Sequence, residues 1–327
     1  MKKIISAILI MVLILFALPL NSFAEQENTY GGIDMSKYSK SELDLSQFTL
    51  EDIMNMSAEE YGALVREFER VYDPYGTYVE GNETMLNNGE EVSPLWTSGE
   101  ESNGEWTESG SHEYITAAAC SILSTDKGFY SNGAAAVTIS LLISVASLRP
   151  DKDEIGVMIF AGHFYDPATQ KNYANQTNNT AKTNAVKHYN SAVSAANSGN
   201  MELAYEYLGR CLHYVQDANV PHHAANVTAV NSSHGNFESF AFNNIESILG
   251  SYTSISSGNY TTAINSSVSS ITHNAAVNAK MYINRVNDSS NTSQWYSTAN
   301  TCLKNAAKDS AMIMYKFGME SSVPFYT

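Results

Sequence analysis

Histidine and carboxylate residues are paired at a spacing of four in the second half of the chain. His213 and Asp217 form one pair, and His234 and Glu238 form another. On a helix, residues i and i+4 lie on one face, so each pair can converge on one point. Histidine with carboxylate ligands and no thiolate suits Zn²⁺ in a catalytic setting, where an open position holds water. The two pairs therefore predict a metal site.

Further histidines extend this pattern. Pro221 ends the helix that carries the first pair, and His222 and His223 follow it directly. His163 precedes a turn with an acid, and His112 opens a predicted helix. Several ions close together favour phosphoester hydrolysis, because they can activate water and hold phosphoryl oxygens. The His-Glu-x-x-His motif of single-metal peptidases and the Gly-x-Ser-x-Gly motif of serine hydrolases are both absent from the sequence.

Helical segments must position these side chains. Apolar stripes at helical spacing begin at His112 and at Ala134, where a buried run extends to Leu148 and is closed by Arg149-Pro150. Further helices are expected over about 181–197, 200–217, 235–249, 258–286 and 293–318. No segment of the sequence alternates with the period of a strand, so we predict an all-α fold with one multi-helix domain.

The first 24 residues indicate export. Lys2 and Lys3 precede an apolar run, and Ser22-Phe23-Ala24 is a small-x-small cleavage signal. Residues 1–24 are therefore predicted to be a signal peptide of a secreted protein. An uncleaved membrane anchor is the alternative, although the run is short for a span of about 20 residues.

Residues 25–95 hold most of the negative charge. They contain 16 Asp and Glu against 4 Lys and Arg, while the whole chain carries a net charge of −16. Two capping boxes begin at Thr49 and Ser57, and the second opens an amphipathic helix. We interpret 25–95 as a small helical pro-segment with a linker, either an inhibitory propeptide or a permanent extension. Residues 96–327 form the main domain and show no basic patch for nucleic acid.

The three cysteines do not suggest a disulfide framework. Cys120, Cys211 and Cys302 are odd in number and widely spaced. We expect them to be small apolar residues of the core, with at most one bridge.

Longer motifs around the histidines resemble a known family, the bacterial zinc-dependent phospholipases C, which include the Bacillus cereus enzyme and the catalytic domain of clostridial alpha-toxin. The matching stretches are HFYDP at 163–167, YLGRCLHYVQDANVPHHAAN at 207–226, HGNFESFA at 234–241, Pro150-Asp151, and Gly110-Ser111-His112. The resemblance spans about residues 96–327. It implies the all-α phospholipase C/P1 nuclease fold and three zinc ions.

The resemblance also implies a role for each ligand position. One ion would be bound by Asp151, His163, His213 and Asp217. A second would be bound by His223, His234 and Glu238. The third would be bound by His112, by Asp217 as a bridge, and by the amino group and carbonyl of an N-terminal Trp freed by cleavage. Asp151 is also implied as the general base, and Phe160 as a wall of the choline pocket.

Some positions depart from the family pattern. Gln216 replaces a small residue and Ala218 a larger aliphatic one. Lys152 stands where one branch of the family has Tyr beside choline, and its charge would repel choline but could meet an anionic headgroup. Trp96 and Trp106 both remain candidates for the terminal Trp, and the flexible linker before Trp96 favours that residue.

Three functions therefore compete at this stage. The first is a secreted, monomeric phospholipase C that acts on a phospholipid membrane surface, with no protein partner implied. The second is an S1/P1-type zinc nuclease, which shares the three-zinc core; against it, the second histidine pair ends in Glu238 rather than Asp. The third is a non-enzymatic protein that keeps the metal motifs for stability.

Overall fold

The computed structural model describes residues 29–76, 101–102, 105–106, 110–129, 133–153 and 157–321. The predicted signal peptide, most of the linker and Trp96 lie outside the described residues. Trp106 is described only as backbone, in a two-residue strand. In this part of the chain helices dominate, and the strands are two-residue pairs. The predicted all-α fold with a preceding helical segment is confirmed.

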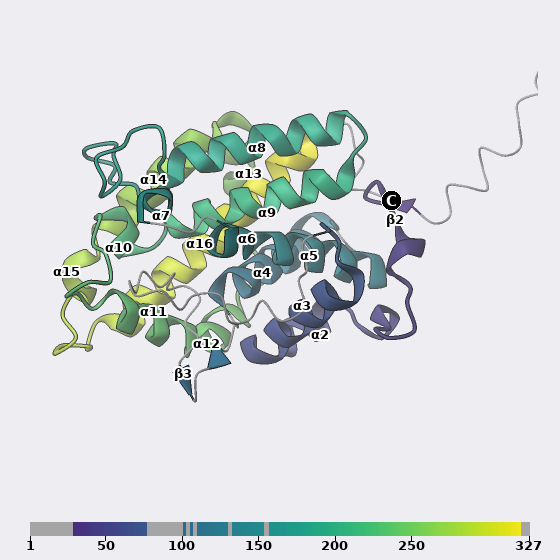
Figure 1. Ribbon diagram of the computed structural model, residues 1–327, viewed down its shortest axis with the longest axis horizontal. Helices are drawn as coiled ribbons and strands as arrows, with labels where there is room; N and C mark the ends of the chain where they lie inside the picture. The colour runs from purple at the N-terminus through teal and green to yellow at the C-terminus, as the bar shows by residue number, and fades with distance from the viewer. Residues whose placement is uncertain are drawn as a thin grey trace, which may run out of the picture.

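The elements follow one another in two groups (Figure 1). The N-terminal segment, residues 29–76, holds β1 (Thr29–Tyr30), β2 (Ile33–Asp34), η3 (Met35–Tyr38), η4 (Leu45–Gln47), α2 (Leu50–Asn55) and α3 (Ala58–Tyr72). The main domain holds β3 (Glu101–Ser102), β4 (Glu105–Trp106), α4 (Ser111–Lys127), α5 (Gly133–Ser147), α6 (Arg149–Asp153), α7 (Val157–Phe160), η6 (Ala161–His163), α8 (Ala181–Asn197), α9 (Met201–Asp217), α10 (Pro221–Ala224), α11 (His234–Phe242), α12 (Ile245–Leu249), α13 (Ser257–Asn265), α14 (Val268–Lys280), α15 (Ile283–Val286) and α16 (Trp295–Glu320).

A bundle of long helices forms the centre of the main domain. Helices α8 and α9 form a hairpin, and α5 packs on the other side of α9 (Figure 1). The turn between α8 and α9 contains Gly199 at φ +79°, a conformation that glycine adopts without steric cost. Helix α16, the longest, packs against α4, α9, α13 and α14. Helix α9 is therefore covered on several sides, and its last turn lies deep in the domain.

A glycine lets α5 and α9 approach closely. A Cβ atom at Gly209 would lie 2.5 Å from both the carbonyl oxygen of Ile143 and the Cβ of Ala146. Real carbon atoms do not approach so closely, so a side chain at this position would push the two helices apart. Gly209, the glycine of the Tyr-Leu-Gly motif, thus allows the close packing of the two helices. It lies four residues before His213 on α9.

The N-terminal segment shares the core of the main domain. Tyr61, Val65 and Phe68 of α3 are fully buried, and the Tyr61 hydroxyl lies 2.9 Å from Ser144 Oγ on α5. Both capping boxes predicted from the sequence are present, at Thr49 and at Ser57. The segment is therefore a packed layer on α4 and α5 rather than a separate small unit.

Two predicted long helices are wrong in detail. The helix expected over 235–249 is divided into α11 and α12 at Asn243 and Asn244. The helix expected over 258–286 is divided into α13, α14 and α15. Ser267 caps α14 by accepting a hydrogen bond from the Ser270 amide, which competes with continuation of the preceding helix. Arg149-Pro150, which was expected to close the buried helix, instead begins the short helix α6. Pro150 lies in the first turn of α6, where its missing N–H costs little.

The apolar run at α5 is a core helix. Of the described residues, 133–153 alone form a helical run with the length and composition of a membrane span, and 83% of its apolar window is buried inside the protein. All three cysteines are buried and free, as expected from their spacing.

The close approach of α5 and α9 predicts the effect of Gly209→Ala. We expect the substitution to destabilise the fold by about 2 kcal/mol through overpacking and to lower Tm by roughly 4–8 °C. Thermal unfolding measures this change. Gly258→Ala in α13 is the matched control, since only Ser256 Oγ lies within 4 Å of a Cβ there, at 3.8 Å. An unchanged Tm for Gly209→Ala would contradict the packing argument.

Candidate metal centre

Six elements bring eight of the predicted ligand residues into one buried cluster. Helix α4 carries His112, α6 carries Asp151, and η6 carries His163. The other ligand residues are His213 and Asp217 on α9, His223 on α10, and His234 and Glu238 on α11. Trp96 lies outside the described residues. The cluster therefore joins helix ends that are far apart in the sequence.

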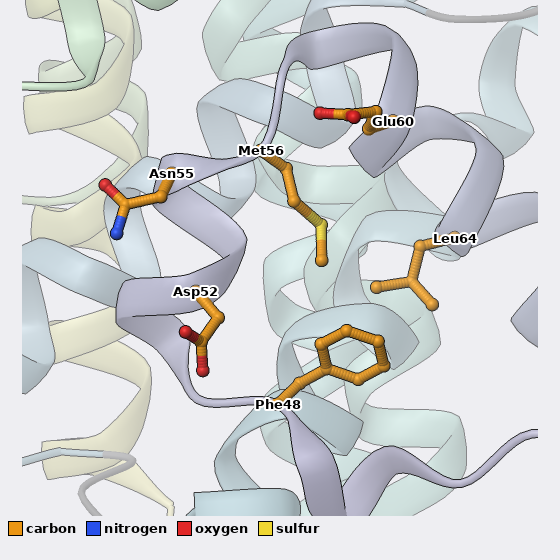
Figure 2. Close-up of a pocket in the computed structure, with 6 residues that line it drawn as sticks. All are labelled: Phe48, Asp52, Asn55, Met56, Glu60 and Leu64. Carbon is orange, nitrogen blue, oxygen red and sulfur yellow. The ribbon is translucent and has the colours of Figure 1, made fainter.

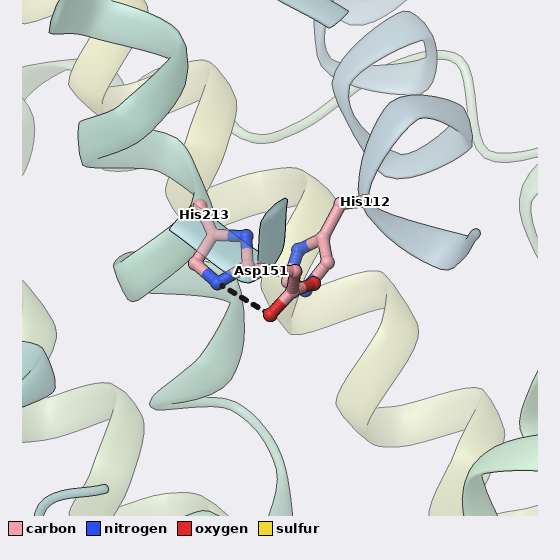
Figure 3. A group of neighbouring side chains, drawn as sticks. All are labelled: His112, Asp151 and His213. Carbon is pink, nitrogen blue, oxygen red and sulfur yellow. Dashed lines mark ion pairs between the residues drawn. The ribbon is translucent and has the colours of Figure 1, made fainter. Parts of the chain in front are cut away.

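Asp151 lies between three of these histidines. Its Oδ1 is 3.5 Å from His213 Nε2 and 3.7 Å from His163 Nδ1, and its Oδ2 is 3.9 Å from His112 Nε2. Figure 3 shows His112, Asp151 and His213 facing one another. Their ligand atoms all lie within 4.8 Å of one another, the separation expected of groups that share an ion.

Asp217 faces histidines with both oxygens. Its Oδ2 is 2.9 Å from His163 Nδ1 and 3.2 Å from His213 Nε2. Its Oδ1 is 3.7 Å from His112 Nε2 and 3.4 Å from His223 Nδ1. A carboxylate placed in this way is able to bridge two ions. His163, His213 and Asp217 form a second group within 4.8 Å.

The third group consists of His223, His234 and Glu238. Glu238 Oε1 is 2.8 Å from His234 Nε2, one turn away on α11, and 3.4 Å from His223 Nε2. This group contains the same three residues that the family resemblance assigns to one zinc ion. The i, i+4 spacing supplies two of the ligands and the short helix α10 supplies the third.

Neighbouring oxygens orient three of the imidazoles. His112 Nδ1 is 2.6 Å from Gln216 Oε1, His213 Nδ1 is 2.8 Å from the Ser147 carbonyl, and His223 Nδ1 is 2.9 Å from the His163 carbonyl. A ring that donates from Nδ1 to such an oxygen presents Nε2 as the nitrogen that can bind a metal.

Sequence reasoning missed the role of Gln216. Its amide nitrogen donates to Thr116 and Ser310, at 3.1 and 3.2 Å, so the amide oxygen is held toward His112. The position was noted only as a departure from the family pattern. Its place one residue before Asp217 on α9 was the available signal.

Charge interactions within the cluster are strong. Burial alone would raise the pKa of Glu238, but the His234 and His223 imidazoles lower it to about 2. Burial alone would lower the pKa of His213, but Asp151 and Asp217 raise it to about 9. Burial also raises the pKa of Asp151, against the effect of His213 and His163. The carboxylates of Glu238 and Asp217 are thus held ionised, ready to bind a cation.

The unpartnered atoms of the cluster fit zinc. Asp151 Oδ2 and Glu238 Oε2 are buried and have no hydrogen-bond partner among the described residues. Buried polar atoms without partners are costly, so a ligand is expected to satisfy some of them. Imidazole and carboxylate donors without a thiolate match a catalytic zinc centre. The residues present therefore fit the metal that the sequence predicts.

Aromatic rings line the cluster. Phe160 is stacked on His163 at 4.5 Å, and Phe164, which sequence reasoning did not single out, is stacked on His223 at 4.4 Å. Lys152 lies one residue after Asp151 with its side chain 36% exposed, and it contacts Glu69. Phe160 and Lys152 thus both lie beside predicted ligand residues.

The remaining histidines lie outside the three groups. His222 is buried and stacked on His234 at 4.7 Å, next to the cluster, as expected of a neighbour of His223. His188 is stacked on Tyr214, and His273 lies 2.9 Å from the Tyr165 hydroxyl.

A separate surface hollow shares no residue with the cluster. It has a volume of about 380 Å³ and lies between α2 and α3 (Figure 2). Its lining consists of Phe48, Asp52, Asn55, Met56, Glu60 and Leu64. Its two acidic side chains, Asp52 and Glu60, already accept hydrogen bonds that cap their own helices. We therefore interpret the hollow as a groove between two packed helices of the N-terminal segment.

The third group predicts the effect of His223→Ala. We expect the protein to lose about one zinc ion, because the remaining two ligands of that group hold the metal poorly. Zinc content is measured by atomic absorption after dialysis. His273→Gln is the matched control, since His273 contacts Tyr165 and no residue of the cluster. A His223→Ala protein with the zinc content of its parent would remove His223 from the site.

The sequence of this chain is similar to those of a known family of proteins. A family model described as zinc dependent phospholipase C matches residues 111–312. A phospholipase C of Bacillus cereus is 36% identical over 138 residues, which cover 42% of this chain and 47% of the relative. A phospholipase C of Clostridium perfringens is 30% identical over 196 residues, which cover 54% of this chain and 48% of the relative. The chain thus spans about half the length of these curated relatives.

Solved structures support the same fold. The alpha-toxin of Clostridium absonum has a TM-score of 0.58 at 23% identity, covering 72% of this chain and 66% of that one. The alpha-toxin of an avian Clostridium perfringens strain has a TM-score of 0.56 at 26% identity, covering 65% of this chain and 64% of that one. Because the family model matches well over half of the sequence and includes every described ligand residue, this chain belongs to the zinc-dependent phospholipase C family.

Proposed function

We propose that the protein is a secreted phospholipase C, which hydrolyses glycerophospholipids at a membrane surface to diacylglycerol and a phosphorylated headgroup. The observation that carries the proposal is the buried cluster of five histidines and three carboxylates, which form three groups, two of them sharing His213. The match to the phospholipase C family supports this function over the S1/P1-type nuclease. The same match leaves the non-enzymatic alternative without support.

The proposed metal complement is three zinc ions. Asp151, His163, His213 and Asp217 would bind one, His223, His234 and Glu238 another, and His112 with Asp217 the third. When bound, zinc supplies Lewis acidity, which makes water a better nucleophile and offsets charge on the phosphoryl oxygens. The two oxygens of Asp217 contact different histidines, Oδ1 near His112 and Oδ2 near His163, and this supports its role as a bridge.

Asp151 is the proposed general base. Its Oδ2 is buried and has no hydrogen-bond partner among the described side chains, so it is able to accept a proton from the attacking water. Burial raises the pKa of this carboxyl, which makes it a better base than an exposed aspartate. The Phe160 and Phe164 rings, stacked on His163 and His223, border the same site.

Phe160 and Lys152 are proposed to contact the headgroup. Phe160 offers an apolar wall beside His163. The ammonium group of Lys152 favours an anionic headgroup over choline. The enzyme is proposed to work as a monomer and to need no protein partner.

Substrate assays test the proposed function. The zinc-loaded protein should release diacylglycerol from phosphatidylcholine or phosphatidylserine vesicles and leave single-stranded DNA intact. Asp151→Asn should lower kcat by roughly 10²–10⁴-fold, because a proton acceptor and a metal ligand are lost. Hydrolysis of DNA without lipid turnover would reject the phospholipase function, and parental activity in Asp151→Asn would remove Asp151 from the reaction.

The third zinc site is proposed to need a free N-terminal Trp. Cleavage before Trp96, in the segment that follows residue 76, would supply that terminus. Sequencing of the secreted protein should therefore give an N-terminus that begins Trp-Thr-Ser, whether or not the cleaved segment stays bound and adds a second one. An N-terminus at Trp106 would assign the role to that residue, and finding only a start before residue 77 would exclude a terminal Trp ligand.

A further inference from the structure

The short helix that carries Asp151 is held by a residue of the N-terminal segment. Glu69, near the end of α3, is 8% exposed. Its Oε1 lies 3.1 Å from Arg149 Nη2, and its Oε2 lies 3.4 Å from Lys152 Nζ. Arg149 and Lys152 stand on either side of Asp151 in α6. One carboxylate therefore contacts both cations that flank the aspartate.

Arg149 depends on the N-terminal segment for its burial. The guanidinium is 4% exposed, and its carbon lies 5.7 Å from the centre of the Tyr75 ring. A buried charge that loses its partner is strongly destabilising. Glu69 and Tyr75 both belong to residues 29–76, and the Tyr75 hydroxyl donates to the Leu142 carbonyl at 2.8 Å. Removing the segment would leave Arg149 without these contacts.

Helix α6 is too short to hold its own position. It has five residues, and an isolated helix of that length is unstable in water. Its far end is fixed by an ion pair between Asp153 and Arg210 of α9. The near end is fixed by Glu69. The orientation of Asp151 toward His112, His163 and His213 thus depends on ion pairs at both ends of the helix.

We propose that Glu69 is a positioning residue for Asp151, acting through Arg149 and Lys152. The inference rests on the proposed function, in which Asp151 is a zinc ligand and general base. It makes the N-terminal segment a working part of the enzyme rather than an inhibitor. We expect the segment to stay bound after cleavage before Trp96, because Tyr61, Val65 and Phe68 are packed in the core.

The test compares Glu69→Gln with Glu67→Gln in the full chain. Glu67 lies on the same helix, its side chain is 41% exposed, and it forms its ion pair with Arg70 of that helix, at 2.6 Å. Steady-state assays on phosphatidylcholine vesicles give kcat and KM, and competition with a chelator gives zinc retention. Glu69→Gln should lower kcat about 10-fold or more and weaken zinc retention about 10-fold, as loss of groups that orient metal ligands does. Glu67→Gln should match the parent in both measurements.

A double variant separates positioning from stability. If Glu69→Gln fails to fold because Arg149 is left unpaired, adding Arg149→Met removes the buried charge and restores folding. The double variant should still show low kcat and weak zinc retention, since the tether is gone. Parental kcat and zinc retention in either folded variant would overturn the inference. A parent that binds zinc but hydrolyses no phospholipid would reject the proposed function, while zinc retention would still decide the role of Glu69.

Discussion

The burial of eight ionisable side chains in one cluster is the constraint that the rest of the structure must satisfy. Three carboxylates and five imidazoles lie together with little access to solvent. Charges in such a place need partners or a bound cation. The imidazoles hold Glu238 and Asp217 ionised, and this leaves carboxylate oxygens that face inward. The cluster is therefore suited to bind metal, and without a bound cation its burial would destabilise the folded state.

The packing of α4, α5 and α9 determines the geometry of the cluster. Gly209 lets α5 approach α9, which brings the Ser147 carbonyl to His213 Nδ1. The next turn of α9 presents Gln216 to His112 on α4. Two histidines from different helices are thus oriented at two helix–helix interfaces, both of which involve α9. The same contacts that stabilise the core select the nitrogen that each ring offers to a metal.

The N-terminal segment packs against α4 and α5 and also contacts α6. It covers α4 and α5 with apolar side chains and contributes buried polar contacts at Tyr61 and Glu69. One of its acidic residues, Glu69, therefore has a defined place in the core. A segment packed in this way differs from a loosely attached leader, because its removal would expose apolar surface on α4 and α5.

The sequence alone determined the helical class of the fold and indicated two pairs of candidate ligands, because both depend on local spacing. The i, i+4 pairs place His213 with Asp217 and His234 with Glu238, and Pro221 places His223 at the start of a new turn. The breaks at Asn243 and Ser267 were not predicted, since apolar periodicity continues across them. Only the tertiary structure decided which oxygens orient the histidines and what holds Asp151. Gln216 and Glu69 act on residues far away in the sequence, and such contacts arise from packing that no local pattern records.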